Sequence, residues 1–449
     1  MADTLLSVGI DVGTTTTQLI VSRLTVENKA SAFSVPEMEI SDRQVVYQSP
    51  IHFTPLLGEN LVDGEKIRDL IAREYEKAGI RPADVDTGAV IITGETSRKE
   101  NARAVTNALS EYAGDFVVAT AGPDLESVLA AKGAGADVYS GETGAKVLHL
   151  DIGGGTANLA WIEDGRITQT GCMNVGGRLV KLDKNGVLTY VSTVLDGIFQ
   201  RKVGERPALA ELEDLAETLV AALEMVAGLR PSTDLPEKLW TRESGMLLPA
   251  LQAGSLLNAG SEVLSFSGGV ADCIEQELPP LAFGDLGPIL GKAIRKSRLC
   301  GGNYRLGQHT IRATVIGAGC HSAQLSGSTV FYQNVTFPMK NLPVATSLEE
   351  LSRLDGPGVL ALTGGVGNYA EIRTMAETLA AGWPKGPVYL ALRSDAAKAL
   401  GQALALRLGR DRPVLCIDRV RFGPQSYLDV GRPLHDAIPV VVKTLILNR

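Results

Sequence analysis

A short stretch near the middle of the chain constrains the fold more than any other. The apolar residues 148–150 are followed by Asp151, by Gly153-Gly154-Gly155 and by Thr156, and a second apolar run begins at Ala157. This pattern predicts a strand, a tight glycine turn and an antiparallel strand. We expect the glycines to adopt positive φ and to bring backbone N–H groups against a ligand, while the strand-end carboxylate suits a hard cation. The alternative is a plain turn.

The same order of chemical types occurs near the start of the chain. At a constant offset of 140, Asp11 matches Asp151, Gly13 matches the first glycine of the later turn, and Thr16 matches Thr156. Apolar runs flank both copies. Internal self-similarity of this kind predicts repeated structural units. We therefore expect two similar half-domains that face one ligand.

Composition narrows the classes of partner and location. The net charge is −8, which argues against nucleic acid as the main partner. The five cysteines are scattered, which favours a reducing compartment, and no apolar run reaches the length of a transmembrane helix. We expect a cytoplasmic protein that binds no membrane, and a homo-oligomer is left open.

The rest of the chain alternates apolar strands with amphipathic helices, as is typical of α/β domains. We predict a first half-domain over residues 1–148, a second half-domain with inserted segments over 149–340, and a C-terminal α/β domain over 341–449. A third strand is expected at 262–267, ending in Gly268-Gly269. The other expected elements are helices at 64–78, 102–112, 207–228 and 313–324, short strands and loops at 25–62, and an irregular segment at 271–312.

Other nucleotide and catalytic motifs are absent from the sequence. There is no Gly-x-x-x-x-Gly-Lys-Ser/Thr sequence, no Gly-x-Ser-x-Gly elbow and no His-x-x-x-His pair. Residues 365–370 follow an expected strand and open an expected helix, but no acidic residue stands where a dinucleotide ribose needs one. We interpret residues 365–370 as a helix-start turn.

The paired Asp-x-Gly-x-x-Thr hairpins and the later Gly-Gly turn resemble the actin-like ATPase superfamily, which includes heat-shock chaperone ATPases and sugar kinases. The resemblance implies an α/β fold of two ribonuclease H-like half-domains around a nucleotide cleft, here with a C-terminal α/β domain. It also implies bound ATP with Mg²⁺. Its implied nucleotide contacts are Asp11, Gly13, Thr14, Thr15 and Thr16 in a first phosphate loop, Asp151, Gly153, Gly154, Gly155 and Thr156 in a second, and Gly268 and Gly269 against the nucleoside.

Hydrolysis requires charge neutralisation and an oriented water. The resemblance implies that Asp11 and Asp151 hold a hydrated Mg²⁺, and it assigns a further carboxylate to the attacking water. Glu126 is our first candidate for that carboxylate. Asp124 is a second candidate, with a plain helix cap as its alternative, and Glu95 is a third.

A longer resemblance covers nearly the whole chain. Its stretches include residues 7–17, 92–95, 147–158, 174–179, 267–270, 312–319, 325–329, 427–434 and 442–445. Together they are similar to the ethanolamine ammonia-lyase reactivating factors of bacterial ethanolamine utilisation. That resemblance places Gly176 and Gly177 among the cofactor-binding residues and implies a chaperone-like ATPase that contacts the cobalamin-dependent lyase.

The family's activity, as the resemblance implies it, is the release of cobalamin that has lost its adenosyl group, so that adenosylcobalamin rebinds. A location in a bacterial microcompartment is an alternative to the free cytoplasm. Two other functions of the same fold stay open. They are a small-molecule kinase or polyphosphate phosphatase, and an actin-like filament protein.

Overall fold

The computed structural model describes most of the chain. It covers residues 3–13, 16–28, 38–58, 61–92, 109, 117–120, 123–230, 236–241, 262–321, 323–326, 330–354, 356–364, 368–383, 386–420, 422, 426–431, 433 and 438–444. By internal contacts the chain divides into two units. Unit 1 comprises residues 1–92, 96–120 and 318–449, and unit 2 comprises residues 93–95 and 121–317. The division falls inside one helix, α9 (Ala313–His321). The bounds of the three domains expected from the sequence stay a prediction.

The N-terminal sheet of unit 1 is built on two long antiparallel strands. Over the described residues its strand order is β3-β2-β1-β7-β8, with the short β4 paired to β2. Strands β1 and β2 run antiparallel, whereas β1, β7 and β8 run parallel to one another. These strands are β1 (Asp3–Val12), β2 (Thr16–Asn28), β3 (Met38–Gln48), β4 (His52–Phe53), β7 (Thr87–Ile92) and β8 (Val117–Thr120), and β5 (Leu56–Gly58) pairs with β6 (Leu61–Val62) nearby.

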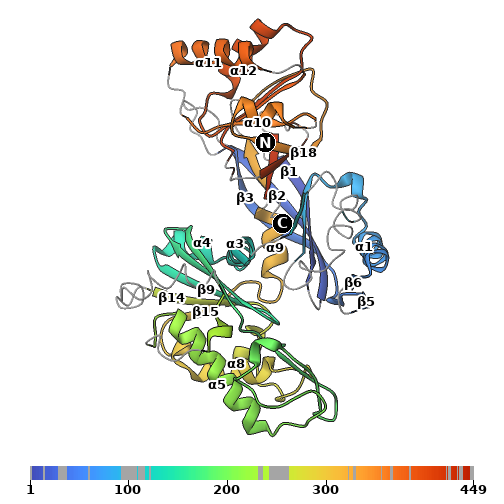
Figure 1. The fold of residues 1–449 in the computed structure, drawn as a ribbon, viewed down its shortest axis with the longest axis vertical. Helices are drawn as coiled ribbons and strands as arrows, with labels where there is room; N and C mark the ends of the chain where they lie inside the picture. The colour runs from blue at the N-terminus through green and yellow to red at the C-terminus, as the bar shows by residue number, and fades with distance from the viewer. Residues whose placement is uncertain are drawn as a thin grey trace. The chain divides into compact units, whose positions relative to one another are not determined.

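Helix α1 (Gly64–Ala78) covers one face of this sheet (Figure 1). The side chain of Asp63 accepts a hydrogen bond from the backbone N–H of Lys66 and caps the first turn, and Gly79 ends the helix with φ +68°. Ile67 and Ile71, one turn apart, are buried against the side chains on one face of β1, such as Ile10. The amphipathic pattern therefore fixes which face of the helix meets the sheet.

The sheet of unit 2 repeats that strand order. Its described strands lie in the order β11-β10-β9-β14-β15. Again the first strand in sequence pairs with an antiparallel neighbour on one side and a parallel one on the other. The strands are β9 (Lys146–Ile152), β10 (Ala157–Glu163), β11 (Arg166–Met173), β14 (Glu262–Ser267) and β15 (Tyr304–Leu306). The predicted repeat of the two half-domains is confirmed in the topology.

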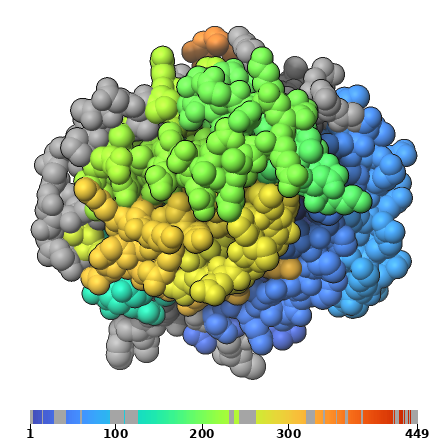
Figure 2. Space-filling view, turned by 90° about the horizontal axis from the view of Figure 1, so that it is seen from below, coloured from blue at the N-terminus to red at the C-terminus, as the bar shows by residue number. Residues whose placement is uncertain are grey.

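Helices pack on both faces of the unit 2 sheet. Helices α3 (Pro123–Gly133) and α4 (Ala136–Thr143) cover one face, and α5 (Leu209–Val226) and α8 (Gly287–Lys296) cover the other. Figure 2 shows the outer side of the second pair, with the green surface of unit 2 beside its yellow surface. Apolar strand residues such as Leu150 and Trp161 fill the core beneath α5 and α8. This leaves the α3 face of the sheet free to carry polar residues.

The C-terminal part of unit 1 forms a further sheet. Its described strands lie in the order β16-β23-β22-β18-β19-β20-β21-β17. The strands are β16 (Ala323–Ser326), β17 (Phe331–Gln333), β18 (Met339–Ala345), β19 (Val359–Leu362), β20 (Val388–Leu392), β21 (Val414–Ile417), β22 (Ser426–Val430) and β23 (Ile438–Thr444), and the helices are α10 (Leu348–Ser352), α11 (Tyr369–Gly382) and α12 (Ala397–Leu408). The parallel β18-β19-β20-β21 run has helical connections, as the βα alternation in the sequence predicts.

Several expected elements differ from the observed ones. The segment expected to hold only short strands instead contains β3, which extends a long hairpin with β2. Residues 271–312, expected to be irregular, contain α7 (Asp272–Glu275), α8 and β15, and the expected helix 313–324 ends at His321. Apart from Leu109, the helix expected at 102–112 lies outside the described residues, and so do residues 365–367 of the turn expected at 365–370. The described end of that turn starts a helix as predicted, because Asn368 caps α11. The shorter elements are η1 (Pro82–Asp84), β12 (Val180–Leu182), β13 (Leu188–Val191), η3 (Thr193–Leu195), η4 (Glu237–Leu239) and η5 (Arg298–Cys300).

The described helices include none with the length and apolar character needed to span a membrane.

Contact between α3 and α9 in unit 2 requires glycine, which gives a testable prediction. A Cβ atom at Gly133 would overlap the carbonyl oxygen of Ala313. We expect Gly133→Ala to lower the thermal unfolding midpoint by several degrees, because overpacking of this kind costs about 1–3 kcal/mol. Gly302→Ala is the control, since a Cβ there meets no atom within 4 Å. Equal midpoints for the two variants, measured by circular dichroism, would contradict the packing argument.

Candidate functional site

The two Asp-x-Gly-x-x-Thr stretches form the same closed turn. The backbone N–H of Gly13 donates to the carbonyl oxygen of Thr16 over 2.9 Å, and the N–H of Gly153 donates to the carbonyl oxygen of Thr156 over 2.9 Å. Two residues lie between the bonded pair in each copy, so both are tight β-hairpin connections. Of the connecting residues in the first copy, Thr14 and Thr15 lie outside the described part.

The strand register places each carboxylate at the same point of its hairpin. Asp11 lies opposite Gln18 in the β1–β2 pair, and Asp151 lies opposite Asn158 in the β9–β10 pair. The offset of 140 seen in sequence thus holds in the register as well. Asp11 is half-buried and Asp151 is buried.

The glycines of the second turn do not have the backbone conformation expected from the sequence. Neither Gly153, Gly154 nor Gly155 has a φ in the left-handed region, so the prediction of positive φ is wrong for this turn. A Cβ on Gly155 would meet no atom within 4 Å, and this residue is exposed. The glycines therefore serve to leave the outer side of the turn free of side chains, which keeps its backbone open to a ligand.

A short segment after β3 supports the first turn. Thr54 donates from Oγ1 to the carbonyl oxygen of Gly13 over 2.8 Å, and its hydroxyl lies 3.1 Å from that of Thr17. Strand β4 pairs with the start of β2, with Phe53 beside Thr16 and His52 beside Thr17. The position of the first turn thus depends on residues about 40 positions further along the chain.

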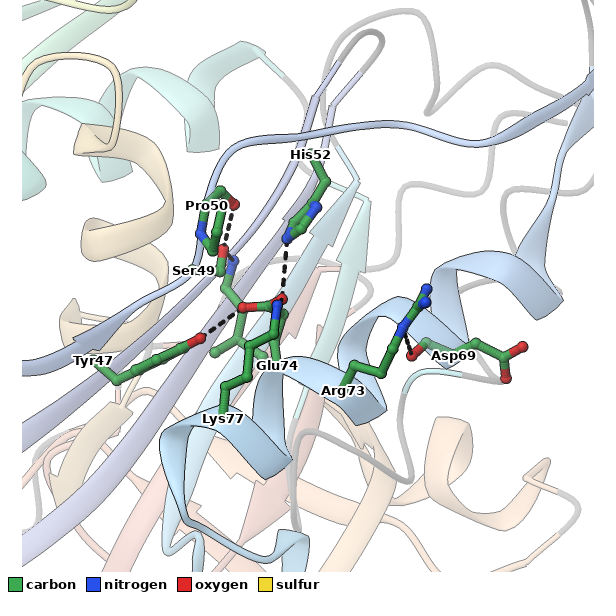
Figure 3. Close-up of polar contacts among 9 residues, drawn as sticks. Tyr47, Ser49, Pro50, His52, Asp69, Arg73, Glu74 and Lys77 are labelled. Atoms are coloured by element: carbon green, nitrogen blue, oxygen red, sulfur yellow. Dashed lines mark hydrogen bonds and ion pairs between the residues drawn. The ribbon is translucent and has the colours of Figure 1, made fainter.

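The buried carboxylate of Glu74 on α1 holds this segment in place, as Figure 3 shows. Glu74 is 1% exposed and accepts hydrogen bonds from the Tyr47 hydroxyl over 2.6 Å and from Lys77 Nζ over 2.7 Å. His52 Nε2 lies 3.2 Å from the same carboxylate. Burial alone would raise the pKa of Glu74, but the bonds from Lys77 and Tyr47 outweigh it and lower the pKa below 4.5. Burial and Glu74 together raise the pKa of Tyr47 to about 12.

The second turn is supported by the Val175-Gly176-Gly177-Arg178 segment. The N–H of Gly177 donates to the carbonyl oxygen of Gly153 over 3.0 Å, and that of Arg178 donates to the carbonyl oxygen of Gly154 over 2.6 Å. A Cβ on Gly176 would overlap Gly154, so only glycine allows this approach. The Gly177 N–H is thereby used on the turn itself. Direct contact of Gly176 and Gly177 with a cofactor stays a prediction.

An ion pair fixes this supporting segment in turn. The Arg178 guanidinium Nε lies 3.0 Å from Asp285 Oδ2, and Asp285 Oδ1 accepts from the Gly287 N–H over 2.9 Å. Burial raises the pKa of Asp285, and its bonds to the Gly287 backbone and to Arg178 oppose that rise. The start of α8 is thus joined to the second turn.

The expected nucleoside turn lies beside the same hairpin. Gly268 has φ +86°, a conformation that favours glycine, and a Cβ on it would overlap the carbonyl of Ile152. The N–H of Val270 donates to the Ile152 carbonyl oxygen over 3.1 Å. Gly269 follows with Ile311 nearby. The structure therefore brings 268–270 next to the end of the strand that carries Asp151.

Asp151 is held by two hydroxyl groups. Ser267 Oγ donates to its Oδ1, and Thr314 Oγ1 on α9 donates to its Oδ2 over 3.4 Å. Burial raises the pKa of Asp151 to about 6, against the effect of both hydroxyl bonds. Two residues earlier, His149 is fully buried between Ser265 and Ser267, and burial lowers its pKa to about 3. A cation at Asp151 would favour the ionised carboxylate.

Glu126 is linked to the neighbourhood of Asp151 through Asn158. Asn158 Nδ2 donates to Glu126 Oε2 over 2.9 Å, and Asn158 lies directly opposite Asp151. The side chains of Asn158 and Asp151 therefore both lie on the α3 face of the sheet. Asp124 lies in the first turn of α3 but its side chain is outside the described part, as is all of Glu95.

Within unit 2 the structure gathers most of the expected site residues of the second half-domain around the end of β9. Reasoning from sequence missed the residues that support the two turns. These are Thr54 and Glu74 in unit 1, and His149, Arg178, Ser265, Ser267, Asp285 and Thr314 in unit 2. One signal for two of them was present. Ser265 and Ser267 alternate with apolar residues in their strand, as His149 and Asp151 do in theirs, so each pair was bound to share one face of its own strand. The parallel register of β9 and β14 then puts both pairs on the same face.

Two half-domains with one strand order, each with a carboxylate-and-turn hairpin after its first strand, define the actin-like ATPase fold. The fold class expected from the sequence is confirmed.

The chain belongs to the family described as ethanolamine utilisation protein EutA, which matches residues 3–356 and 357–448. Two curated relatives are each named "Ethanolamine ammonia-lyase reactivase EutA". The protein of Escherichia coli (strain K12) is 39% identical over 467 residues, covering 98% of each chain. The protein of Salmonella typhimurium (strain LT2) is 39% identical over 471 residues, again covering 98% of each chain.

Solved structures show more distant similarity. The Aquifex aeolicus PPX-GPPA enzyme matches with a TM-score of 0.41 and 11% identity, covering 70% of this chain and 99% of that one. The ethanolamine utilization protein EutJ from Carboxydothermus hydrogenoformans matches with a TM-score of 0.36 and 17% identity, covering 70% of this chain and 89% of that one.

The lowered pKa of Glu74 gives a prediction with a defined pH dependence. Because the folded-state pKa lies below the ordinary 4.5, the charge stabilises the fold above that pH, and this contribution is lost as pH falls through the lowered value. We expect Glu74→Gln to cost about 1–3 kcal/mol at pH 7 and progressively less below pH 4.5. Thermal unfolding midpoints of both proteins, taken at about every half pH unit from pH 3.5 to 7, measure this difference.

Glu76→Gln is the matched control for Glu74→Gln, because it removes the same charge from an exposed position of the same helix. Its midpoint should follow that of the wild type at every pH. A Glu74→Gln deficit that stayed constant down to the acid limit would contradict the assigned charge effect.

Proposed function

We propose that this chain is an ATP-hydrolysing reactivase of ethanolamine ammonia-lyase, which promotes release of cobalamin that lacks its adenosyl group. The observation that carries the proposal is the hairpin built twice, with one register and one closing hydrogen bond, in a chain of the EutA family. The names of the relatives, which are 39% identical over 98% of the chain, support the choice of lyase. We also propose a location in the cytoplasm or in a microcompartment.

In this proposal the two turns contact the phosphates of one ATP. Backbone N–H groups near Gly13 and Gly153, with the hydroxyls of Thr14, Thr15, Thr16 and Thr156, neutralise phosphate charge. The open outer side of Gly155 supports such an approach. Gly268 and Gly269 would lie against the nucleoside, and this role is supported by the close approach of Gly268 to the Ile152 carbonyl and by the bond from the Val270 N–H to the same carbonyl.

The residues fit a hydrated Mg²⁺. Asp151 is a buried carboxylate whose hydrogen-bond partners are two hydroxyls, and oxygen donors of this type suit a hard cation. Asp11 occupies the matching position of the other hairpin. When bound, the cation neutralises charge on the phosphates. Magnesium typically keeps several waters and takes one or two carboxylates, so one aspartate from each turn is sufficient.

Hydrolysis then needs only an oriented water. Water attacks the γ-phosphorus, the bond to the bridging oxygen of ADP breaks, and inorganic phosphate and a proton are released. We propose that Glu126 orients that water, supported by its bond from Asn158 beside Asp151. Asp124 and Glu95 stay as alternatives. ATP-bound and ADP-bound states that differ in affinity for the lyase would couple hydrolysis to cofactor release.

Reactivation is the first test of the proposal. Lyase inactivated with a cobalamin that lacks the adenosyl group is incubated with this chain, ATP and Mg²⁺, and adenosylcobalamin is then added. We expect lyase activity to recover, and we expect no recovery with a non-hydrolysable ATP analogue. No recovery with ATP would refute the proposal. ATP turnover stimulated by a metabolite and not by lyase would favour a kinase or phosphatase, and ATP-dependent light scattering would favour a filament.

Carboxylate variants test the site itself. We expect Asp11→Asn and Asp151→Asn to lower ATP hydrolysis by about 100-fold or more, because each removes a carboxylate that is proposed to hold the Mg²⁺ that neutralises phosphate charge. Glu126→Gln should lower hydrolysis while ATP binding, measured by calorimetry, is retained. Asp164→Asn is the control, since Asp164 is exposed in the β10–β11 turn and asparagine tolerates its φ of +49°. Wild-type rates in both aspartate variants would contradict the metal assignment.

A further inference from the structure

A row of buried polar side chains lies beneath the second hairpin. His149 and Asp151 alternate on β9, and Ser265 and Ser267 alternate beside them on the parallel strand β14. Residues two apart on a strand share a face, so all four point to the α3 side of the sheet. Each of the four is less than a tenth exposed. None of these residues except Asp151 has a role in the proposed ATP hydrolysis.

Hydrogen bonds join the four residues into a chain. Ser265 Oγ lies 3.0 Å from His149 Nδ1, and Ser267 Oγ lies 2.9 Å from His149 Nε2. Ser267 Oγ also donates to Asp151 Oδ1. The ring of His149 therefore bridges two hydroxyls, of which one contacts the carboxylate.

The number of hydrogen-bond protons on each group fixes which group donates in each of these hydrogen bonds. An ionised carboxylate only accepts, so the single hydroxyl proton of Ser267 goes to Asp151. Ser267 must then accept from the ring, which puts the imidazole proton on Nε2. Nδ1 is left as an acceptor and takes the hydroxyl proton of Ser265. Each member thus has one defined orientation.

The first hairpin shows that the fold itself does not need this row of hydrogen-bonded side chains. At the offset of 140, Gly9 takes the place of His149, and the β7 neighbours are Ala89 beside Gly9 and Ile91 beside Asp11. Apolar residues therefore suffice in the matching positions of unit 1. Burying three polar side chains costs free energy unless all are bonded, which indicates a role beyond packing.

We propose that Ser267 is a positioning residue that holds Asp151 Oδ1 in one orientation, with His149 and Ser265 fixing the direction of its hydroxyl. This rests on the proposed function, since the benefit of an oriented Asp151 is a preformed oxygen ligand for the hydrated cation that accompanies ATP. Thr314 restrains Oδ2 from α9, so both oxygens of the carboxylate are held. Partners of this kind typically change metal affinity or activity by about 10–100-fold when removed.

The first measurement is the Mg²⁺ concentration that half-saturates ATP binding, followed with a fluorescent ATP analogue. We expect Ser267→Ala to raise it by about 10–100-fold, and Ser267→Thr, which keeps a hydroxyl, to return it to near the wild-type value. Ser265→Ala should give a smaller rise, because it acts through His149. Ser127→Ala is the matched control, since it removes a hydroxyl that is equally buried and that donates to the Gly171 carbonyl of β11.

The second measurement is the ring tautomer of His149, read from ¹⁵N shifts of histidine-labelled protein and assigned with His149→Gln. We expect the Nε2–H tautomer in the wild-type protein and a changed Nε2 shift in Ser267→Ala. This readout needs no ATP, and the tautomer itself is read from the wild-type protein, with His149→Gln used only to assign the signal.

The outcomes separate the two proposals. A wild type that binds ATP with Mg²⁺, combined with a Ser267→Ala variant that matches Ser127→Ala, overturns the positioning role. The Nδ1–H tautomer overturns it as well, because the hydroxyl of Ser267 would then point away from Asp151. A wild type that shows no Mg²⁺-dependent ATP binding refutes the proposed function, and the tautomer then decides alone whether the hydrogen-bond chain exists.

Discussion

The hydrogen bond that closes each Asp-x-Gly-x-x-Thr turn is the constraint on which the other features depend. In both copies a glycine N–H donates to a threonine carbonyl oxygen over 2.9 Å. This bond fixes the antiparallel register, and the register places each aspartate at the end of a buried strand with its hairpin partner opposite. The rest of each half-domain then supports the turn from outside: Thr54 and Glu74 in unit 1, and Gly177 with Arg178 in unit 2.

The two halves are alike in topology but not in chemistry. The first turn is held by a threonine and by a buried, ion-paired glutamate on α1, whereas the second is held by backbone bonds and by an arginine–aspartate pair. Beneath Asp11 the neighbouring strand is apolar, and beneath Asp151 it carries two serines. The two halves thus share their backbone geometry, while the side chains around each carboxylate differ. Such differences allow one aspartate to be held more firmly than the other.

Much of the fold could be predicted because it rests on local patterns. The period of apolar residues gave α1 and β14 with the observed bounds, and the offset of 140 gave the repeated hairpins. Prediction failed where long-range pairing decides. Strand β3 is mostly polar and is held by its pairing with β2, and α8 lies in a segment whose short apolar runs look irregular in isolation. The positive φ expected for residues 153–155 was also wrong. These glycines keep the outer side of the turn free of side chains and do not adopt a left-handed backbone conformation.

The sequence by itself determined the family, the two hairpins and the pair of carboxylates, because these depend on residue types at fixed local spacing. Only the tertiary structure decided what holds each carboxylate. Ser267 reaches Asp151 across 116 positions through parallel strand pairing, and Thr314 reaches it across 163 positions from a helix that packs against α3. Contacts at such separations leave no periodic trace in the chain. They follow from which strands lie side by side, and that is settled by burial of the whole core.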